Sequence, residues 1–71
     1  MSEEDLARID FFASGVEEPI EVKEFEATTS TQIMSIGKKM LMAQPGADYA
    51  YVFWRGRRLT ITYDTNVMGA Y

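Results

Sequence analysis

The sequence predicts an α+β domain in which four strands form one sheet and a single helix packs across one face of that sheet. Two pairs of segments alternate apolar and polar residues as strands do, and turn residues separate the segments within each pair. Between the pairs, apolar residues recur at helical spacing after a threonine-rich start. The 71 residues suffice for one domain. We expect a flexible N-terminus over 1–5, a ββαββ core over 6–63 and a C-terminal tail over 64–71.

The first pair of strands is predicted over residues 6–13 and 20–25. The first strand alternates, with Ala7, Ile9 and Phe11 on one side and Arg8, Asp10 and Phe12 on the other. Ser14-Gly15 and the acidic turn Glu17-Glu18-Pro19 then separate it from the second strand. There, Ile20 and Val22 alternate with Glu21 and Lys23. Phe25 falls out of this phase, which predicts a bulge or the end of the strand.

The helix is predicted over residues 30–43. Thr29 and Gln32 have the spacing of a capping box, and Gln44-Pro45-Gly46 ends the helical pattern. One face collects Ile33, Ile36, Gly37, Met40 and Leu41. Gly37 lies in the helix interior, where glycine lowers helix stability by about 1 kcal/mol relative to alanine. We expect one of two explanations. Either Gly37 makes room for a large side chain, with the aromatic residues of 48–55 as candidates, or it has no structural consequence.

The second pair of strands is predicted over 48–55 and 58–63, joined by Arg55-Gly56-Arg57. In the first of them Tyr49, Tyr51 and Phe53 alternate with Ala50, Val52 and Trp54. In the second, Leu59, Ile61 and Tyr63 are expected to face inward, with Thr60 and Thr62 outward. The predicted core comprises Ile9, Phe11, Val22, Ile33, Ile36, Met40, Leu59 and Ile61.

The order and lengths of these elements over about residues 6–63 resemble the β-grasp arrangement, including the bacterial immunoglobulin-binding domains of similar size. The threonine-rich entry to the helix, Glu26-Ala27-Thr28-Thr29, adds to this resemblance. It implies a fold and no function. The β-grasp sulfur carriers and ubiquitin-like modifiers end in Gly-Gly, whereas this chain ends Met68-Gly69-Ala70-Tyr71, so we do not expect that chemistry.

Residue content argues against catalysis and metal binding. The chain has no cysteine and no histidine, which removes disulfides, thiolates and the commonest general base and zinc ligand. The acidic residues of 17–26 are expected to form a solvated edge, and Asp64-Thr65-Asn66 is too short for a calcium loop. We therefore expect no catalytic residue, no metal site and no cofactor.

Segment composition also bears on compartment. No run of about 18 apolar residues could span a membrane. The acidic start, Met1 to Asp5, is unlike a signal peptide. We therefore expect a complete chain in the cytoplasm.

Charge is divided unevenly along the chain, although the net value is −4. Residues 1–31 carry nine acidic and two basic side chains, and residues 32–71 carry five basic and two acidic ones. This division predicts either two surfaces of opposite sign or, as the favoured interpretation, complementary faces that folding brings together.

Aromatic residues exceed what one helix can cover, and this excess predicts an interface. Partner binding is assigned to Phe12, Tyr49, Tyr51, Phe53, Trp54, Arg55, Arg57 and Arg58. If the helix covers Ala50, Val52 and Trp54, then Tyr49, Tyr51 and Phe53 are exposed; in the opposite case Trp54 and Val52 are exposed instead. The competing interpretation is that the tail, through Val67, Met68 and Tyr71, covers this surface.

We expect a non-enzymatic protein-binding module, an inhibitor or adaptor that either meets a dedicated protein partner or forms a homodimer. Its small, acidic, cysteine-free build resembles that of bacteriophage-encoded inhibitors of host enzymes. One alternative is a nucleic-acid-binding protein that uses the aromatic strand and the arginines of 55–58; the net negative charge disfavours it. Another is a structural subunit of a larger assembly.

Overall fold

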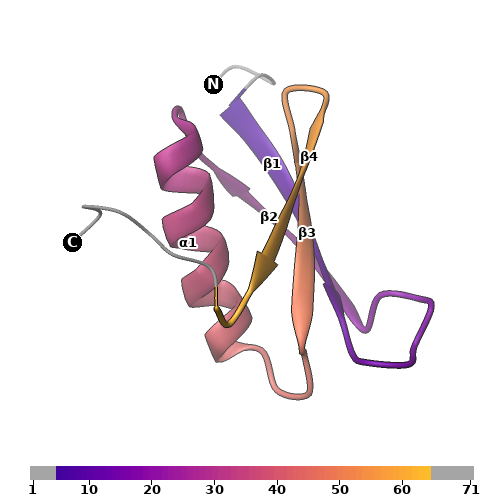
Figure 1. Ribbon diagram of the computed structural model, residues 1–71. Helices are drawn as coiled ribbons and strands as arrows, with labels where there is room; N and C mark the ends of the chain where they lie inside the picture. Colours follow the sequence, from indigo (N-terminus) through magenta and orange to yellow (C-terminus); the bar gives the residue numbers. More distant parts are fainter. Residues whose placement is uncertain (1–4, 65–71) are drawn as a thin grey trace.

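Four strands and one helix follow one another in the order ββαββ in the computed structural model, which describes residues 5–64 (Figure 1). This confirms the predicted class and element order. The elements are β1 (Leu6–Phe12), β2 (Glu21–Glu26), α1 (Ser30–Ala43), β3 (Tyr49–Trp54) and β4 (Arg57–Thr62). The expected flexible N-terminus, except for Asp5, and the expected tail, except for Asp64, lie outside the described residues.

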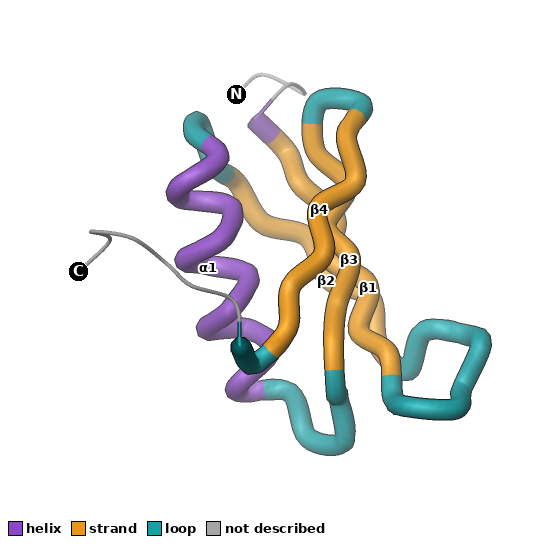
Figure 2. The backbone as a smooth tube through the Cα atoms, viewed as in Figure 1, coloured by secondary structure: helices purple, strands orange, loops and turns teal. Residues whose placement is uncertain are grey.

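The four strands form one sheet in the order β2-β1-β3-β4, and every neighbouring pair is antiparallel. The helix lies along one face of this sheet (Figures 1 and 2). The resemblance to the β-grasp arrangement extends to the element order and the single helix. It does not extend to strand pairing, because the central strands here are β1 and β3 and are antiparallel, whereas a β-grasp sheet places its first and last strands side by side in parallel.

The two central strands present their smaller or fully apolar rows to the helix. In β1 the alternation is as predicted: Ala7, Ile9 and Phe11 are fully buried under α1. In β3 the helix-facing row consists of Ala50, Val52 and Trp54. Because successive residues of a strand point to opposite faces, Tyr49, Tyr51 and Phe53 lie on the other side of the sheet.

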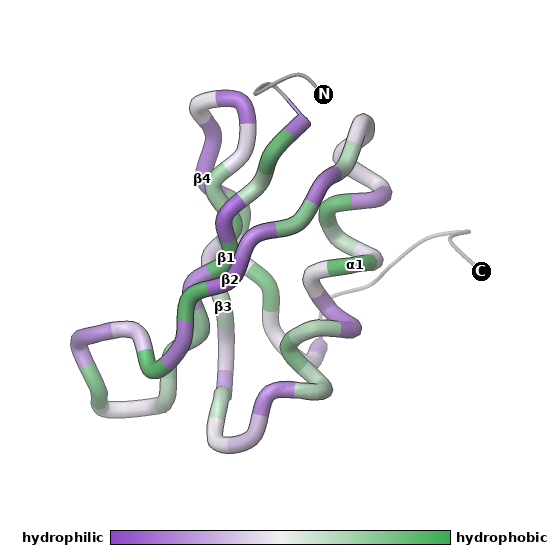
Figure 3. Tube along the Cα trace, turned by 180° about the vertical axis from the view of Figure 1, so that it is seen from behind, coloured by the Kyte–Doolittle hydropathy of each residue, from purple (hydrophilic) through white to green (hydrophobic). Residues whose placement is uncertain are grey.

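Strand β2 departs from the prediction. It begins at Glu21, and its pairing with β1 runs without interruption from Phe11↔Glu21 to Leu6↔Glu26. Of the two alternatives predicted at Phe25, the bulge is therefore wrong, and the end of the strand lies one residue later, at Glu26. The unbroken register puts Phe25 on the helix side and Val22 on the opposite side, where Val22 is 46% exposed. Val22 is therefore not a core residue. As an edge strand rich in charged residues, β2 shows several hydrophilic positions along its length (Figure 3).

The helix begins where the capping sequence predicts. Thr29 is the N-cap, and its hydroxyl oxygen accepts a hydrogen bond of 3.1 Å from the Gln32 backbone N–H. The return bond is one residue earlier than a capping box requires, because the Gln32 amide oxygen accepts from the Thr28 N–H at 2.8 Å.

The buried stripe of α1 is narrower than predicted. Its fully covered members are Ile33, Gly37 and Leu41, whereas Ile36 and Met40 are half-buried at the margins. Four strands of limited length cover only the centre of the helical face. The predicted core residues Ile36, Met40 and Leu59 are therefore peripheral, while Ile9, Phe11, Ile33 and Ile61 are confirmed as core.

At Gly37 the helix lies close against the side chains of β3 and β4. A β-carbon on Gly37 would overlap the Cδ1 atom of Ile61 and lie 3.5 Å from Cγ2 of Val52. The neighbours of Gly37 are thus aliphatic side chains of β3 and β4, not the aromatic residues that the sequence indicated. The glycine has a structural consequence, because a larger residue would require either the Ile61 side chain or the helix to shift.

A two-residue turn closes the β3–β4 hairpin, with Trp54 paired to Arg57. Arg55 and Gly56 both have positive φ, 50° and 74°, as the favoured hairpin turn of this length requires. Beyond β4, Tyr63 is exposed rather than buried as predicted, although its hydroxyl donates to the Ala47 carbonyl oxygen at 2.6 Å.

Removing a core side chain tests the helix-on-sheet packing. Ile33→Ala is expected to lower the free energy of unfolding by about 2–5 kcal/mol, because Ile33 is fully buried and the cavity cannot fill. The matched control Met42→Ala removes a side chain on the same helix that is 65% exposed and should change stability little. Urea denaturation measures both; equal effects would contradict the packing described.

The close approach at Gly37 makes a second prediction. Gly37→Ala should improve helix propensity by about 1 kcal/mol yet lower stability overall, because overpacking a core costs about 1–3 kcal/mol. Ile61→Val removes the atom that the new methyl group would overlap. In that background Gly37→Ala should become neutral or stabilising. A double-mutant cycle by thermal unfolding reads the coupling, and additive effects would refute the contact.

Candidate functional site

The face of the sheet opposite α1, which we call the open face, is not covered by any element within residues 5–64 (Figures 1 and 2). Strand pairing sorts its side chains into rows that cross the sheet from β2 to β4. The first row consists of Glu24, Arg8, Phe53 and Arg58, and the second of Val22, Asp10, Tyr51 and Thr60. A third holds Phe12, Tyr49 and Thr62. The two central strands of the open face therefore carry aromatic rings and the Arg8–Asp10 pair, and its edge strands carry Glu24, Val22, Arg58 and threonines.

Three rings at the centre of the open face touch one another. Phe12 stacks on Tyr49 with centroids 5.4 Å apart and ring planes 7° from parallel. Tyr51 meets both rings edge-on, 5.3 Å from Phe12 and 5.5 Å from Tyr49. Such pairs are favourable beyond the area they bury. The antiparallel register of β1 and β3, which pairs Phe12 with Tyr49, brings these three rings together.

Two arginines extend this aromatic cluster. The guanidinium carbon of Arg58 lies 5.0 Å from the centre of the Tyr51 ring, and that of Arg8 lies 4.6 Å from the centre of Phe53. Arg8 also donates to both carboxylate oxygens of Asp10, at 3.0 and 3.4 Å. Asp10 is only 9% exposed, whereas the Arg8 side chain is about half exposed, so the carboxylate lies beneath a guanidinium group that it neutralises.

The structure divides the predicted partner-binding residues into two groups. Phe12, Tyr49, Tyr51, Phe53 and Arg58 lie on the open face. The remaining three lie at the hairpin tip and on the helix side: Trp54, Arg55 and Arg57. Sequence reasoning placed all eight together because it could not assign the face of Trp54 or the direction of the turn.

Trp54 serves the core rather than the open face. It is 7% exposed, and its indole N–H donates to the Ala27 carbonyl oxygen at 3.2 Å. Arg55 covers its outer surface, with the guanidinium carbon 4.4 Å from the ring centre, and pairs with Asp5 at 3.1 Å. These contacts close the end of the sheet nearest the start of α1.

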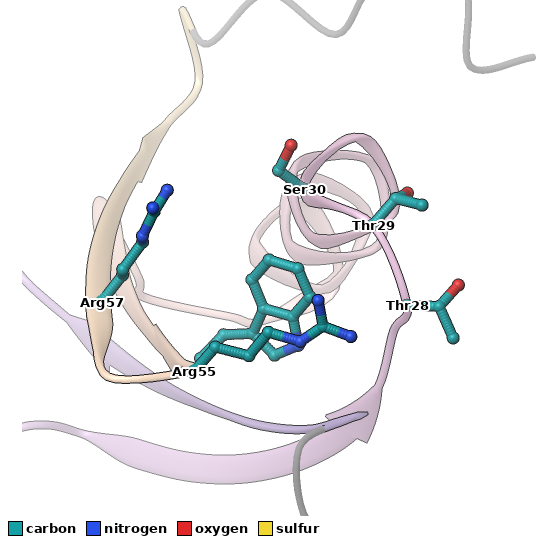
Figure 4. Close-up of a pocket in the computed structure, with 6 residues that line it drawn as sticks. Thr28, Thr29, Ser30, Arg55 and Arg57 are labelled. Carbon is teal, nitrogen blue, oxygen red and sulfur yellow. The ribbon is translucent and has the colours of Figure 1, made fainter.

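A pocket of about 390 Å³ opens beside this contact (Figure 4). It is lined by Thr28, Thr29, Ser30, Trp54, Arg55 and Arg57. Several of these groups already have structural roles, since the Thr29 hydroxyl caps the helix and Arg55 lies over Trp54. The pocket is therefore a place where two arginines meet a helix N-terminus, and we assign it no ligand.

Arg8 and Asp10 are members of the open face that the sequence did not single out. The alternation of β1 already placed both on the same side as Phe12. The sequence did not reveal which residues of β3 lie beside them. Only the β1–β3 pairing sets Arg8 opposite Phe53 and Asp10 opposite Tyr51. An arginine in phase with an aromatic residue on a strand is the signal that could have found them.

Opposite charges lie at opposite edges of the sheet. On the open face β2 carries Glu24 and Glu26, whereas β4 carries Arg58, and two strands separate them. The favoured expectation, that folding brings the acidic and basic parts of the chain into contact, therefore fails for β2 and β4. It holds locally for the Arg55–Asp5 pair at the hairpin tip.

The described residues hold neither a metal-ligating cluster nor a helix that could span a membrane. Residues 5–64 contain no group of three or more histidine, cysteine, aspartate or glutamate side chains placed to hold a metal ion. The helix present in that range is not long and apolar enough to cross a membrane.

Comparisons with known proteins supply no relative: no protein-family model matches the chain, and neither curated proteins nor solved structures give a significant match.

The assignment of faces in β3 is directly testable. Tyr51→Ser combined with Phe53→Ser should leave a cooperatively folded protein, because both side chains lie on the open face. Val52→Ser, one position away and fully buried, should lower the unfolding free energy by several kcal/mol, about 2–5, since it opens a cavity and buries a hydroxyl. Circular dichroism with urea denaturation compares them. The reverse ranking would mean that the register is inverted.

Proposed function

We propose that this chain is a non-enzymatic protein-binding module and that the open face is its binding surface. One observation carries the proposal: aromatic rings and arginine guanidinium groups share the centre of the uncovered face. Aromatic residues and arginine are the residue types enriched at protein interfaces and among those that dominate binding energy. The edge strands add Glu24 on β2 and Arg58 on β4 to a mostly polar rim, as is typical of protein interfaces. The module would act by occupying a partner's surface, as an inhibitor or adaptor does.

The contacts within the open face favour a protein partner over a nucleic acid. Bases stack on free ring faces, but one face of Phe53 is taken by Arg8 and one face of Tyr51 by Arg58. Arg8 is neutralised by Asp10, and Glu24 lies next to it on β2. Affinity for a phosphate backbone grows with the number of cations that contact it, and this face offers few.

Single-stranded nucleic acid is a second candidate because of one specific feature. RNA-binding sheets stack bases on aromatic residues of their exposed face, and here the rings lie on the two central strands of a four-stranded sheet with its helix behind. Arg58 would then contact a phosphate.

The proposal predicts that binding depends on the open face alone. The tagged chain is used to capture proteins from an extract of the cells that express it, and each captured protein is purified and titrated against three variants. Tyr51→Ser and Phe53→Ser should each weaken binding at least about tenfold, because they remove central rings. Met42→Ser, on the exposed side of α1, is the matched control and should bind as the unmodified chain does.

Two results would contradict the proposal. Equal loss of binding with Met42→Ser would mean that the open face is not the binding surface. Binding of a labelled single-stranded oligonucleotide at low salt, weakening steeply as salt rises and abolished by Arg58→Ala, would establish the second candidate instead.

A further inference from the structure

We propose that the protein partner of the open face is a second copy of this chain, stacked face to face about a two-fold axis parallel to the strands. This inference rests on the proposed function, since it requires the open face to bind protein. It is carried by the order of charges and rings in the first row of the open face, which complements itself in only one of the two simple stacking orientations.

The first row runs from a carboxylate to a guanidinium group. Strand pairing sets Glu24 opposite Arg8, Arg8 opposite Phe53, and Phe53 opposite Arg58. Glu24 is therefore at the β2 edge and Arg58 at the β4 edge of the same row, at one level along the strands. Neither forms an ion pair with another residue of the described range.

A two-fold axis parallel to the strands, between two stacked open faces, preserves the level along each strand and reverses the order of the strands. The β2 strand of one copy then lies over β4 of the second copy. Glu24 of each copy faces Arg58 of the other, which gives two equivalent ion pairs, as an isologous interface requires. In the middle of the row, Arg8 faces Phe53 of the second copy, which repeats the cation–π contact made within each chain.

The alternative axis, in the plane of the stack but perpendicular to the strands, preserves strand order. It would place β2 over β2 and β4 over β4, so that the acidic edges of the two copies would face each other, and so would the basic edges. Like charges brought together at an interface disfavour that arrangement. The charge pattern thus selects the parallel axis.

The other rows fit the same axis. In the second row Asp10 would face Tyr51 of the second copy. The Tyr51 hydroxyl of one copy could then donate a hydrogen bond to the mostly buried Asp10 carboxylate of the other. In the third row Phe12 would face Tyr49 of the second copy, ring against ring. Stacked sheets lie about 10 Å apart and cross at about 30°, so the rows nearest the axis would match best.

A charge exchange tests the inference. Glu24→Arg and Arg58→Glu should each weaken self-association at least about tenfold, since each creates two like-charge contacts across the axis. An equimolar mixture of the two variants should associate again, because the two substituted side chains, now of opposite charge, would face each other across the axis and one native pair would re-form beside them. The double variant Glu24→Arg/Arg58→Glu should self-associate like the unmodified chain. Analytical ultracentrifugation over a range of concentrations measures all four samples.

Matched controls lie on the same strands with side chains on the other face. Glu21→Arg on β2 and Arg57→Glu on β4 make the same charge changes on the helix side and should leave self-association unchanged. Circular dichroism of every variant checks that it is folded. The restored mixture gives an independent check, since only folded chains can re-form the interface.

The outcomes separate this inference from the proposed function. A chain that stays monomeric at millimolar concentration, while Tyr51→Ser and Phe53→Ser still lose another protein, overturns the dimer and leaves the proposed function standing. Self-association that the mixture does not restore overturns the axis. A monomer that loses no protein partner with either serine variant overturns both, and oligonucleotide binding through Arg58 would do so as well.

Discussion

The alternation of side chains along β1 and β3 assigns each residue of the two central strands to one of two faces, and a single helix can cover only one of those faces. The helix covers the face that carries Ile9 and Phe11 of β1 and Val52 and Trp54 of β3, and Gly37 lets its backbone approach Ile61 and Val52 closely. The row of Tyr49, Tyr51 and Phe53 consequently lies on the open face.

The order of strands determines the electrostatics of the open face. Acidic residues cluster early in the chain and basic residues late, yet the chain folds so that β2 and β4 become opposite edges. The aromatic cluster between them is neutral, since Arg8 and Asp10 cancel. A surface with edges of opposite sign is complementary to a second copy in reversed strand order, which is the arrangement of the proposed dimer.

Size gives the proposed association a thermodynamic context. A domain of about 60–70 residues buries only about 60% of its unfolded-chain surface and is marginally stable. No cysteine is present to cross-link it. Ligand binding to the folded state stabilises it by mass action, and a second copy acts as such a ligand, so the midpoint of unfolding of the proposed dimer would rise with protein concentration. The open face would then contribute to folding as well as to recognition.

The sequence by itself determined the element order, the helix from Ser30 to Ala43 with Thr29 as its cap, and the two alternating rows of β1 and β3, because these depend on local periodicity and capping. Tertiary structure alone decided which row of β3 lies under the helix. Local pattern treats the two faces of a strand alike, so Trp54 could not be separated from Tyr51, and Val22 on an edge strand looked like core. Arg8 lies beside Phe53 because β1 pairs with β3, and this pairing is a contact between residues distant in the chain that a local pattern does not reveal.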